Sequence, residues 1–229
     1  MGLHTDLAAW VRKTLKEPWT IRNGSVVPTA DSVGLGNQAV RLEGCVLYAD
    51  LAGSTDLVDT KEPQFAALVY KTYLHCAAKL IRESGGQITA YDGDRIMAVF
   101  LGSNQCPSAV TAALRINYAC LNTVNPIMKQ EFPSANYVVR HTVGIDKSML
   151  FVATEGVRGA KDLVWVGRAA NYAAKLSDRP SKAIWITSDV FAELPRNLRV
   201  TTAGQSCWAE EPWRGIRIYG SDATMQIPD

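Results

Sequence analysis

Two acidic segments of the sequence contain residue types that could bind a phosphate group together with a metal ion. The first, Asp50–Thr55, places a carboxylate at the end of an apolar strand and follows it with a small, flexible turn. Gly53 lets the backbone approach a ligand, and the N–H groups that begin the next helix favour anions. A simpler alternative is that Ser54 or Thr55 caps this helix and that Asp50 only ends the strand.

The second segment, Ala90–Arg95, contains an Asp-Gly pair that is typical of a hairpin turn. Asp94 follows this turn at the start of an apolar strand, so its carboxylate could lie beside the end of the Asp50 strand. Two carboxylates on adjacent strands can hold a pair of Mg²⁺ or Mn²⁺ ions, an arrangement suited to phosphoryl chemistry. An ordinary hairpin turn is the alternative.

A third segment, Val166–Lys175, places Asn171 and Lys175 four residues apart, so both lie on one face of a helix. An ordinary residue of the first helical turn and a solvated lysine are the alternative. The pair becomes a candidate site only in combination with the two acidic segments.

The rest of the chain predicts the elements that position these segments. Apolar residues at helical spacing predict helices at 63–84, 107–124 and 168–176. β-Prone runs predict strands at 45–49, 87–91, 95–100, 137–145, 149–154, 163–166, 183–186 and 214–219, with a turn at Asp146-Lys147. The order strand–helix–strand–strand–helix–strand is ferredoxin-like, an α+β fold in which helices flank an antiparallel sheet.

The first 40 residues are too few to form a hydrophobic core of their own. A helix is expected at 6–17, and Asn23-Gly24 between β-prone residues predicts a hairpin. The chain is therefore expected to comprise an N-terminal helix and hairpin extension, 1–40, and one larger domain, 41–229.

The composition excludes several classes of partner. The 229 residues include 24 Lys and Arg against 22 Asp and Glu, and the net charge of +2 gives no electrostatic case for nucleic acid or an acidic membrane surface. No apolar run approaches the roughly 20 residues that span a bilayer, and the first residues do not form a secretion signal, so a cytoplasmic protein is expected. Five scattered cysteines and three histidines do not make the pattern of a zinc site, so a metal should take oxygen ligands.

In this order, the three segments resemble the class III nucleotidyl cyclases, the catalytic-domain family of adenylyl and guanylyl cyclases. The resemblance covers about 42–220 and includes the Asp–Gly–Ser–Thr turn, the Gly93-Asp94 pair and the spacing of Gly167, Asn171 and Lys175. It implies that 41–229 is a nucleotidyl cyclase catalytic domain. It also implies a head-to-tail homodimer with composite active sites at the interface.

The resemblance further implies roles for the acidic segments. Asp50 and Asp94 of one subunit would hold two Mg²⁺ or Mn²⁺ ions, helped by the carbonyl of Leu51. The amides of the turn at Gly53–Thr55 would cradle the β- and γ-phosphates of a nucleoside triphosphate. One ion would lower the pKa of the ribose 3′-hydroxyl, and the other would offset charge on the pyrophosphate leaving group.

The other subunit would supply Asn171 to position the ribose and Lys175 to face the α-phosphate, while Arg214 would contact the terminal phosphates. Attack of the 3′-hydroxyl on the α-phosphorus would then yield a 3′,5′-cyclic nucleotide. Lys175 stands where the family usually has Arg, and a lysine keeps the charge but loses the bidentate fork.

The base-binding positions differ from those of purine cyclases. Adenylyl cyclases of this class read adenine with Lys and with Asp or Thr where this sequence has Ala90 and Val164, which cannot hydrogen-bond a base. The Glu and Cys typical of guanylyl cyclases are missing as well. The patterns at Tyr48–Thr55 and Gly167–Leu176 look like those of the bacterial pyrimidine cyclases of the Pycsar antiphage system, which make cyclic UMP or cyclic CMP for a separate effector. Tyr48 could narrow the base pocket against a purine, or could be a strand aromatic of the core.

UTP is the expected substrate, and this preference comes from the resemblance alone. Three alternatives stay open: a cytidylate cyclase, an adenylate cyclase that reads its base through the backbone, and a non-catalytic pseudo-cyclase that only binds nucleotide. In each case, we expect a homodimer and no nucleic-acid or membrane partner.

Overall fold

The computed structural model describes two stretches of the chain, residues 2–157 and 160–228. They divide into two compact units. The smaller comprises Met1–Glu43 and Met149–Gly167, and the larger comprises Gly44–Ser148 and Arg168–Asp229. The predicted division into 1–40 and 41–229 stays a prediction.

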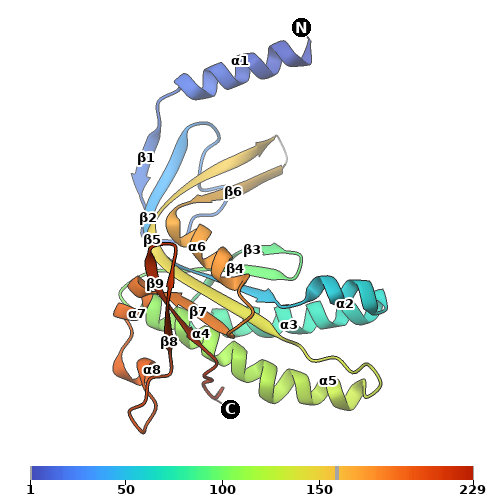
Figure 1. Cartoon of the computed structure of the whole chain (residues 1–229). Coiled ribbons are helices and arrows are strands. Elements are labelled where there is room, and N and C mark those ends of the chain that lie inside the picture. Colours follow the sequence, from blue (N-terminus) through green and yellow to red (C-terminus); the bar gives the residue numbers. More distant parts are fainter. Residues whose placement is uncertain (1, 158–159, 229) are drawn as a thin grey trace. The chain divides into compact units, whose positions relative to one another are not determined.

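A mainly antiparallel sheet with the strand order β3-β4-β2-β5-β7-β9-β8 organises the larger unit (Figure 1). Its strands are β2 (Gln38–Leu51), β3 (Gln87–Asp92), β4 (Arg95–Phe100), β5 (His141–Val157), β7 (Ile184–Thr187), β8 (Ala209–Trp213) and β9 (Ile216–Ser221), of which β2 and β5 extend into the smaller unit. Helices join β2 to β3 and β4 to β5, so the order β3-β4-β2-β5 is the ferredoxin-like arrangement. The predicted α+β fold is confirmed.

The helices of the larger unit cover both faces of this sheet. They are α2 (Ser54–Thr60), α3 (Pro63–Glu83), α4 (Gln105–Ala119), the π-helical turn η1 (Cys120–Val124), α5 (Asn125–Glu131), α6 (Arg168–Ser177), α7 (Ser188–Ala192) and α8 (Arg196–Arg199). Val143 and Ile145 of β5 lie in one core cluster with buried residues of α3 and α4, whereas a Cβ on Gly144 would meet the backbone of α6. Because adjacent strand residues point to opposite faces, α3 and α4 cover one face and α6 covers the other.

The strand predicted at 137–145 begins only at His141, and two predicted breaks in the larger unit are wrong. No turn forms at Asp146-Lys147, because β5 runs unbroken through both residues, and Asp146 is fully buried in a hydrogen-bonded network. The helix predicted to end before Pro126 continues through η1 into α5. Pro126 lies in the first turn of α5, where a missing backbone N–H costs little.

In the part of the smaller unit that the structure describes, three elements belong to this unit alone. The helix α1 (Leu3–Lys16) confirms the helix predicted at 6–17. Strand β1 (Thr20–Asn23) pairs in parallel with the start of β2, and β6 (Ala160–Val166) pairs antiparallel with the end of β5. Within the described residues, no helix of either unit is long and apolar enough to cross a membrane.

The hairpin predicted at Asn23-Gly24 is wrong. The amide of Gly24 donates to the carbonyl of Arg41, which continues the pairing of β1 with β2. A Cβ on Gly24 would stand 2.4 Å from Cγ1 of Val40, so this glycine allows a close approach to β2. The Asn-Gly pair therefore serves strand packing and does not reverse the chain.

The buried imidazole of His141 predicts a loss of stability at acidic pH. Burial lowers the pKa of His141 from 6.5 to about 4, so the unfolded chain binds more protons than the folded chain between these values. The contribution of His141 to the free energy of unfolding should therefore fall as the pH decreases from about 6.5 to about 4, by on the order of 3 kcal/mol. The carboxyl of Asp50, whose pKa burial raises to about 6, acts in the opposite direction, so the prediction concerns the difference between the wild type and His141→Leu. Urea unfolding of the wild type and of His141→Leu across this range measures the effect.

His141→Leu removes the titrating imidazole, so its free energy of unfolding should fall less than that of the wild type as the pH decreases over this range. His4→Leu, on the exposed side of α1, is the matched control and should leave the profile as it is in the wild type. An equal pH dependence in the wild type and in His141→Leu would contradict the assignment.

Candidate active site

Asp50 lies near the end of β2 on the face of the sheet that α6 covers. Its neighbours Ala49 and Leu51 are buried in the core cluster with α3 and α4, so Asp50 points to the opposite face. In the β2–β4 register it lies opposite Arg95, the first residue of β4, and its side chain is only 14% exposed. Strand alternation thus presents a nearly buried carboxylate on the α6 face.

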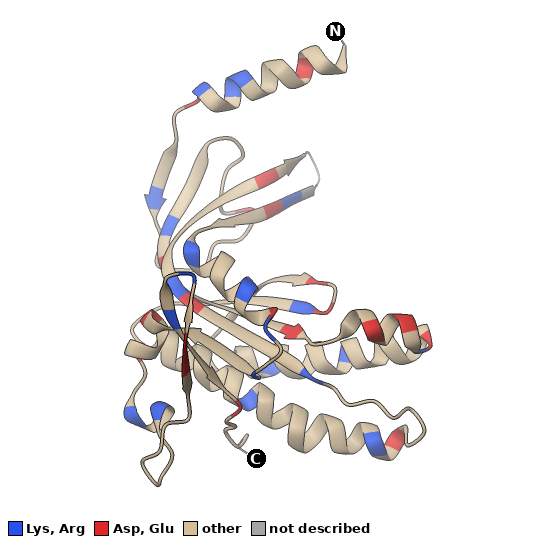
Figure 2. Ribbon diagram, viewed as in Figure 1, with Lys and Arg blue, Asp and Glu red and all other residues tan. Residues whose placement is uncertain are grey.

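Arg95 joins Asp50 to Asp178, which directly follows α6. Nη2 of Arg95 donates to Oδ2 of Asp50 at 3.0 Å and to Oδ1 of Asp178 at 2.9 Å. Asp94 lies close enough to act on the charge of Asp50, and Figure 2 shows acidic and basic residues side by side at the β3–β4 turn. Three carboxylates and one guanidinium therefore gather where β2, β4 and α6 meet.

Burial and neighbouring charges both act on this cluster. Burial raises the pKa of the Asp50 carboxyl to about 6; the positive charge of Arg95 opposes the rise, and the negative charges of Asp94 and Asp178 add to it. The positive charge of Arg95 therefore does not fully offset the cost of ionising the Asp50 carboxyl at this nearly buried position. A cation bound here would favour its ionised form.

The oxygen donors of the cluster suit a hard divalent cation. The carboxylates of Asp50 and Asp94 and the backbone carbonyl of Leu51 are the ligand type that Mg²⁺ and Mn²⁺ prefer. Across 2–157 and 160–228, no three His, Cys, Asp or Glu side chains are arranged to hold an ion, and Arg95 bridges Asp50 and Asp178. The oxygen atoms of these residues are suited to bind a divalent cation. On binding such an ion, the Asp50 carboxylate would exchange the guanidinium of Arg95 for the metal ion.

The turn after Asp50 contains Gly53 in the left-handed conformation, with φ of 75°, which favours glycine. Gly53 is the N-cap of α2, and in the described chain no side chain caps this helix, so the alternative of a Ser54 or Thr55 cap is wrong. The amide of Leu57 donates to the Gly53 carbonyl at 3.1 Å. The amides before Leu57 begin the helix without an intrahelical acceptor.

A row of side chains crosses the sheet beside the Asp50 cluster. Ala90 of β3 lies opposite Met97 of β4, and Met97 lies opposite Tyr48 of β2. Tyr48 is two residues before Asp50, so the two share a face, and Tyr48 is half-buried. Tyr48 and Ala90 thus share the face that carries Asp50, two strands apart with Met97 between them.

Asn171 and Lys175 lie on the exposed side of α6, and Asp178 continues the same stripe beyond its end. The other side of the helix is buried and small: Ala169, Ala170, Ala173, Leu176 and Ser177. This amphipathic pattern confirms the predicted helix and the predicted common face of Asn171 and Lys175.

Gly144 of β5 allows α6 to pack directly on the sheet. A Cβ at this position would stand 2.1 Å from the backbone oxygen of Ala173 and 2.5 Å from the backbone nitrogen of Ser177. A side chain of any size would push the helix away. The helix that carries the candidate residues is therefore held at backbone contact distance from β5.

The first residue of α6, Arg168, anchors the helix to a buried carboxylate. Asp146 is 0% exposed and accepts hydrogen bonds from Nε and Nη2 of Arg168 at 3.0 and 3.2 Å and from the hydroxyl of Thr187 at 2.5 Å. Arg168 also donates to the carbonyl of Lys147 at 2.8 Å and pairs with Asp189. Burial raises the pKa of Asp146, whereas the hydrogen bonds from Thr187 and Arg168 lower it. This network fixes the N-terminus of α6.

The two remaining sequence candidates belong to different units. Arg214 occupies the turn between β8 and β9 with φ of 51°, and its guanidinium lies 5.4 Å from the centre of the Trp213 ring. Trp213 in turn contacts the ring of Tyr172 in α6, with 5.0 Å between the ring centres, so Arg214 lies beside a residue that packs on α6. Val164 lies on β6 of the smaller unit, where it is 42% exposed and lines a cavity of about 680 Å³.

Sequence reasoning missed Arg95, Asp178 and Tyr73. The β-pairing register would have placed Arg95 opposite Asp50, and the three-residue spacing from Lys175 would have placed Asp178 on the same helix face. The hydroxyl of the buried Tyr73 in α3 donates to the carbonyl of Asp50 at 3.4 Å. No signal in the sequence distinguishes Tyr73 from an ordinary core aromatic.

The fold is similar to those of solved nucleotidyl cyclases. The guanylyl cyclase Cya2 has a TM-score of 0.66 and 20% identity over 81% of this chain and 94% of its own. The adenylyl cyclase CyaB from P. aeruginosa has a TM-score of 0.61 and 20% identity over 80% and 94%. The guanylyl cyclase domain of the RhoGC fusion protein from Blastocladiella emersonii, which is described as dimeric, has a TM-score of 0.62 and 11% identity over 79% and 94%. The chain has the class III nucleotidyl cyclase fold.

Sequence similarity narrows this class. No family model matches the chain. It is 46% identical over 228 residues to a uridylate cyclase of Burkholderia cepacia, with 99% of both chains covered. It is 44% identical over 231 residues to a uridylate cyclase of Xanthomonas perforans, with 99% and 100% covered. The chain belongs to the uridylate cyclase family of nucleotidyl cyclases.

Arg168→Met should destabilise the fold because it leaves the buried Asp146 carboxylate with the Thr187 hydroxyl as its remaining side-chain partner. Removing one member of a buried ion pair costs about 3 kcal/mol or more. Asp189→Asn removes the more exposed carboxylate of the same network and should cost less than about 1 kcal/mol. Urea unfolding measures both.

Adding Asp146→Asn to Arg168→Met removes the stranded charge and should recover part of the lost stability. Equal losses for Arg168→Met and Asp189→Asn, or no recovery in the double variant, would contradict the anchoring role of Asp146.

Proposed function

We propose that this chain is a nucleotidyl cyclase that converts UTP to 3′,5′-cyclic UMP and pyrophosphate. The observation that carries the proposal is the match, over nearly the whole chain, to proteins named uridylate cyclase. The gathering of Asp50 and Asp94 at adjacent strand ends supports it, because this reaction needs oxygen ligands beside a triphosphate.

Asp50 and Asp94, with the carbonyl of Leu51, are proposed to hold Mg²⁺ or Mn²⁺. When bound, such ions lower the pKa of the ribose 3′-hydroxyl and offset negative charge on the pyrophosphate. Arg95 would then leave Asp50 while retaining Asp178. The hydrogen bond from Tyr73 to the carbonyl of Asp50 would hold the strand end in place during this exchange.

The phosphates are proposed to bind over the turn Gly53–Thr55. Its amides precede the first intrahelical hydrogen bond of α2, and Gly53 allows the triphosphate to approach the backbone closely. In the reaction, the 3′-oxygen forms a bond to the α-phosphorus, the bond from that phosphorus to the bridging oxygen breaks, and the hydroxyl proton passes to solvent. Charge builds on the departing pyrophosphate, and Arg214 is the proposed basic contact.

The α6 residues are proposed to complete the site of a partner subunit. The seven positions from Asn171 to Asp178 span about 10 Å along the helix, and Asp178 is the residue that reaches the chain's own Arg95. Asn171 therefore stands well along the helix from its own cluster, which supports its use in a second copy. Asn171 would orient the ribose, and Lys175 would face the α-phosphate.

The base is proposed to lie on the row that contains Tyr48 and Ala90. The half-buried phenol ring of Tyr48 reduces the space beside Asp50, and Ala90 offers no hydrogen bond to a base. A pyrimidine fits a smaller space than a purine does. Val164 is the second base-binding position that the resemblance implies, and like Ala90 it offers no hydrogen bond to a base.

The resemblance also places such a cyclase in Pycsar antiphage defence, in the cytoplasm, with the cyclic product read by a separate effector. These parts of the proposal rest on the resemblance and stay predictions.

Product analysis with the four nucleoside triphosphates tests the activity. We expect cyclic UMP to be the main product when the purified protein is incubated with Mn²⁺ and each triphosphate, with products resolved by mass spectrometry. Cyclic CMP or cyclic AMP as the main product would overturn the proposed substrate, and no product from any triphosphate would favour a pseudo-cyclase.

Asp50→Ala and Asp94→Ala test the proposed metal ligands. Each variant should abolish turnover while the dimer survives, and full activity in either would overturn the metal assignment.

Subunit mixing tests the composite site. Asp50→Ala and Asn171→Ala should each be inactive as homodimers, because every site then lacks one half. In a heterodimer of the two variants, one of the two sites is intact. An equal mixture of freely exchanging subunits should therefore regain about a quarter of the wild-type rate. Inactivity of the mixture, once heterodimers have been demonstrated with two affinity tags, would contradict a shared site.

A further inference from the structure

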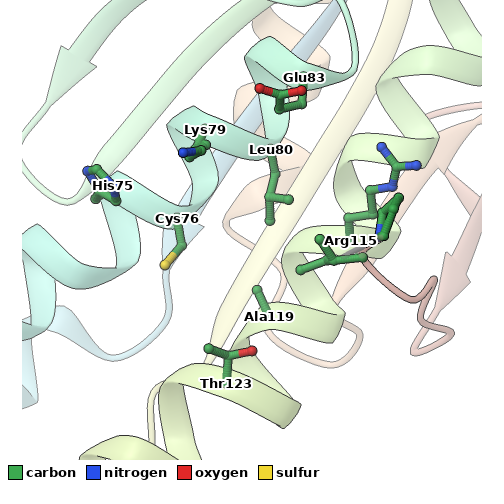
Figure 3. Close-up of a pocket in the computed structure, with 10 residues that line it drawn as sticks. His75, Cys76, Lys79, Leu80, Glu83, Arg115, Ala119 and Thr123 are labelled. Carbon is green, nitrogen blue, oxygen red and sulfur yellow. The ribbon is translucent and has the colours of Figure 1, made fainter.

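A second cavity lies between α3, α4 and the C-terminal tail of the larger unit, within one compact unit of the protein. It has a volume of about 430 Å³, which is within the range of small-molecule sites. In Figure 3, Leu80 comes from α3, Ala119 comes from α4, and Thr123 lies on the turn beyond. None of the residues that line it belongs to the Asp50 cluster or to the exposed face of α6.

The cavity combines an apolar floor with basic groups. Leu80 and Ala119 are buried, and Ile227 of the tail adds to the same surface. Lys79 and Arg115 line the cavity from opposite helices, and Glu83 is the acidic residue among the lining residues that the structure describes (Figure 3). The lining therefore matches a molecule with an apolar part and a negatively charged group.

Arg115 points to an anionic ligand. Its Nε is buried and has no hydrogen-bond partner in the described chain; the same holds for Nε of Arg179 and Arg199, but of the three only Arg115 lines the cavity. A buried donor without an acceptor is costly, and native proteins seldom keep one without a reason. An anion in the cavity would supply the acceptor.

The backbone around the cavity is irregular where a simple helix would have sufficed. Directly after α4 the chain forms the π-helical turn η1, which contributes Thr123 to the cavity wall. Such turns are rare in proteins, and those that occur often lie at functional sites. The tail is fixed as the opposite wall, because Nδ2 of Asn117 donates to the carbonyls of Asp222 and Ala223, both at 3.0 Å. The amide of Met225 also donates to the carbonyl of Leu114 at 3.2 Å, so the tail is bonded to α4 up to two residues before Ile227.

We propose that the α3–α4 cavity binds a small amphipathic anion, a carboxylate or phosphate monoester with a short alkyl portion. Arg115 would donate Nε–H to the anionic group, Lys79 would add positive charge at the mouth, and the alkyl portion would lie on Leu80 and Ile227. This site is separate from the proposed nucleotide site and does not depend on the cyclase activity.

Thermal unfolding with chemically matched probes tests the site. We expect hexanoate or hexyl phosphate, at millimolar concentration and constant ionic strength, to raise Tm by about 2 °C or more, since a ligand that binds only the folded state stabilises it. Hexylammonium and inorganic phosphate should not, because each lacks one half of the required chemistry. The comparison of hexanoate with hexyl phosphate identifies the preferred anionic group, and no shift with either would overturn the proposal.

Variants locate the effect. Arg115→Met should abolish the shift without lowering Tm of the free protein, because it removes an unpaired buried donor and keeps the apolar stem. Glu83→Gln should enlarge the shift by removing the opposing charge, and Arg82→Met, on exposed α3 surface outside the cavity, should leave it unchanged. A shift that survives Arg115→Met, or a lower Tm of that variant without ligand, would overturn the proposal. Persistence of the shift in Asp50→Ala would confirm that binding is independent of the nucleotide site.

Discussion

The backbone contact between α6 and β5 at Gly144 is the constraint on which the geometry of the site depends. With no Cβ in the way, the helix lies on the strand, and the small residues Ala169 and Ala173 complete the fit. Arg168 then fixes the N-terminus of the helix to Asp146. These contacts determine both the distance of α6 from β5 and the rotation of α6 about its own axis, so the exposed face of the helix has one orientation.

Strand alternation determines the other half of the site. Because odd-numbered residues of β2 belong to the core with α3 and α4, Tyr48 and Asp50 must share the opposite face. A shift of one residue in the β2–β4 register would bury both in the core and expose Leu51. The hydrophobic core therefore selects the register, and the register delivers the carboxylate and the aromatic ring beside one another.

Much of this could be predicted from the sequence because it depends on local spacing. The hairpin that presents Asp94 and the helix that carries Asn171 follow from short-range patterns, and the order of elements indicated the fold. What could not be predicted depends on contacts between distant segments. The sequence Asn23-Gly24 is typical of a turn, and only its contact with Val40 explains why it lies in a paired strand. The charge of Asp146 indicated a turn, and only its ion pair with Arg168 explains why this residue is buried in a strand.

One structural feature links the two halves of the proposed dimer. Helix α6 ends at Ser177, and Asp178 directly beyond it is bound through Arg95 to the chain's own Asp50. In the proposed dimer, the same helix would offer Asn171 to the partner's site and would therefore extend from one catalytic centre toward the other. The release of Arg95 from Asp50 at one centre would then alter a helix that also serves the other, so the two sites would not act independently.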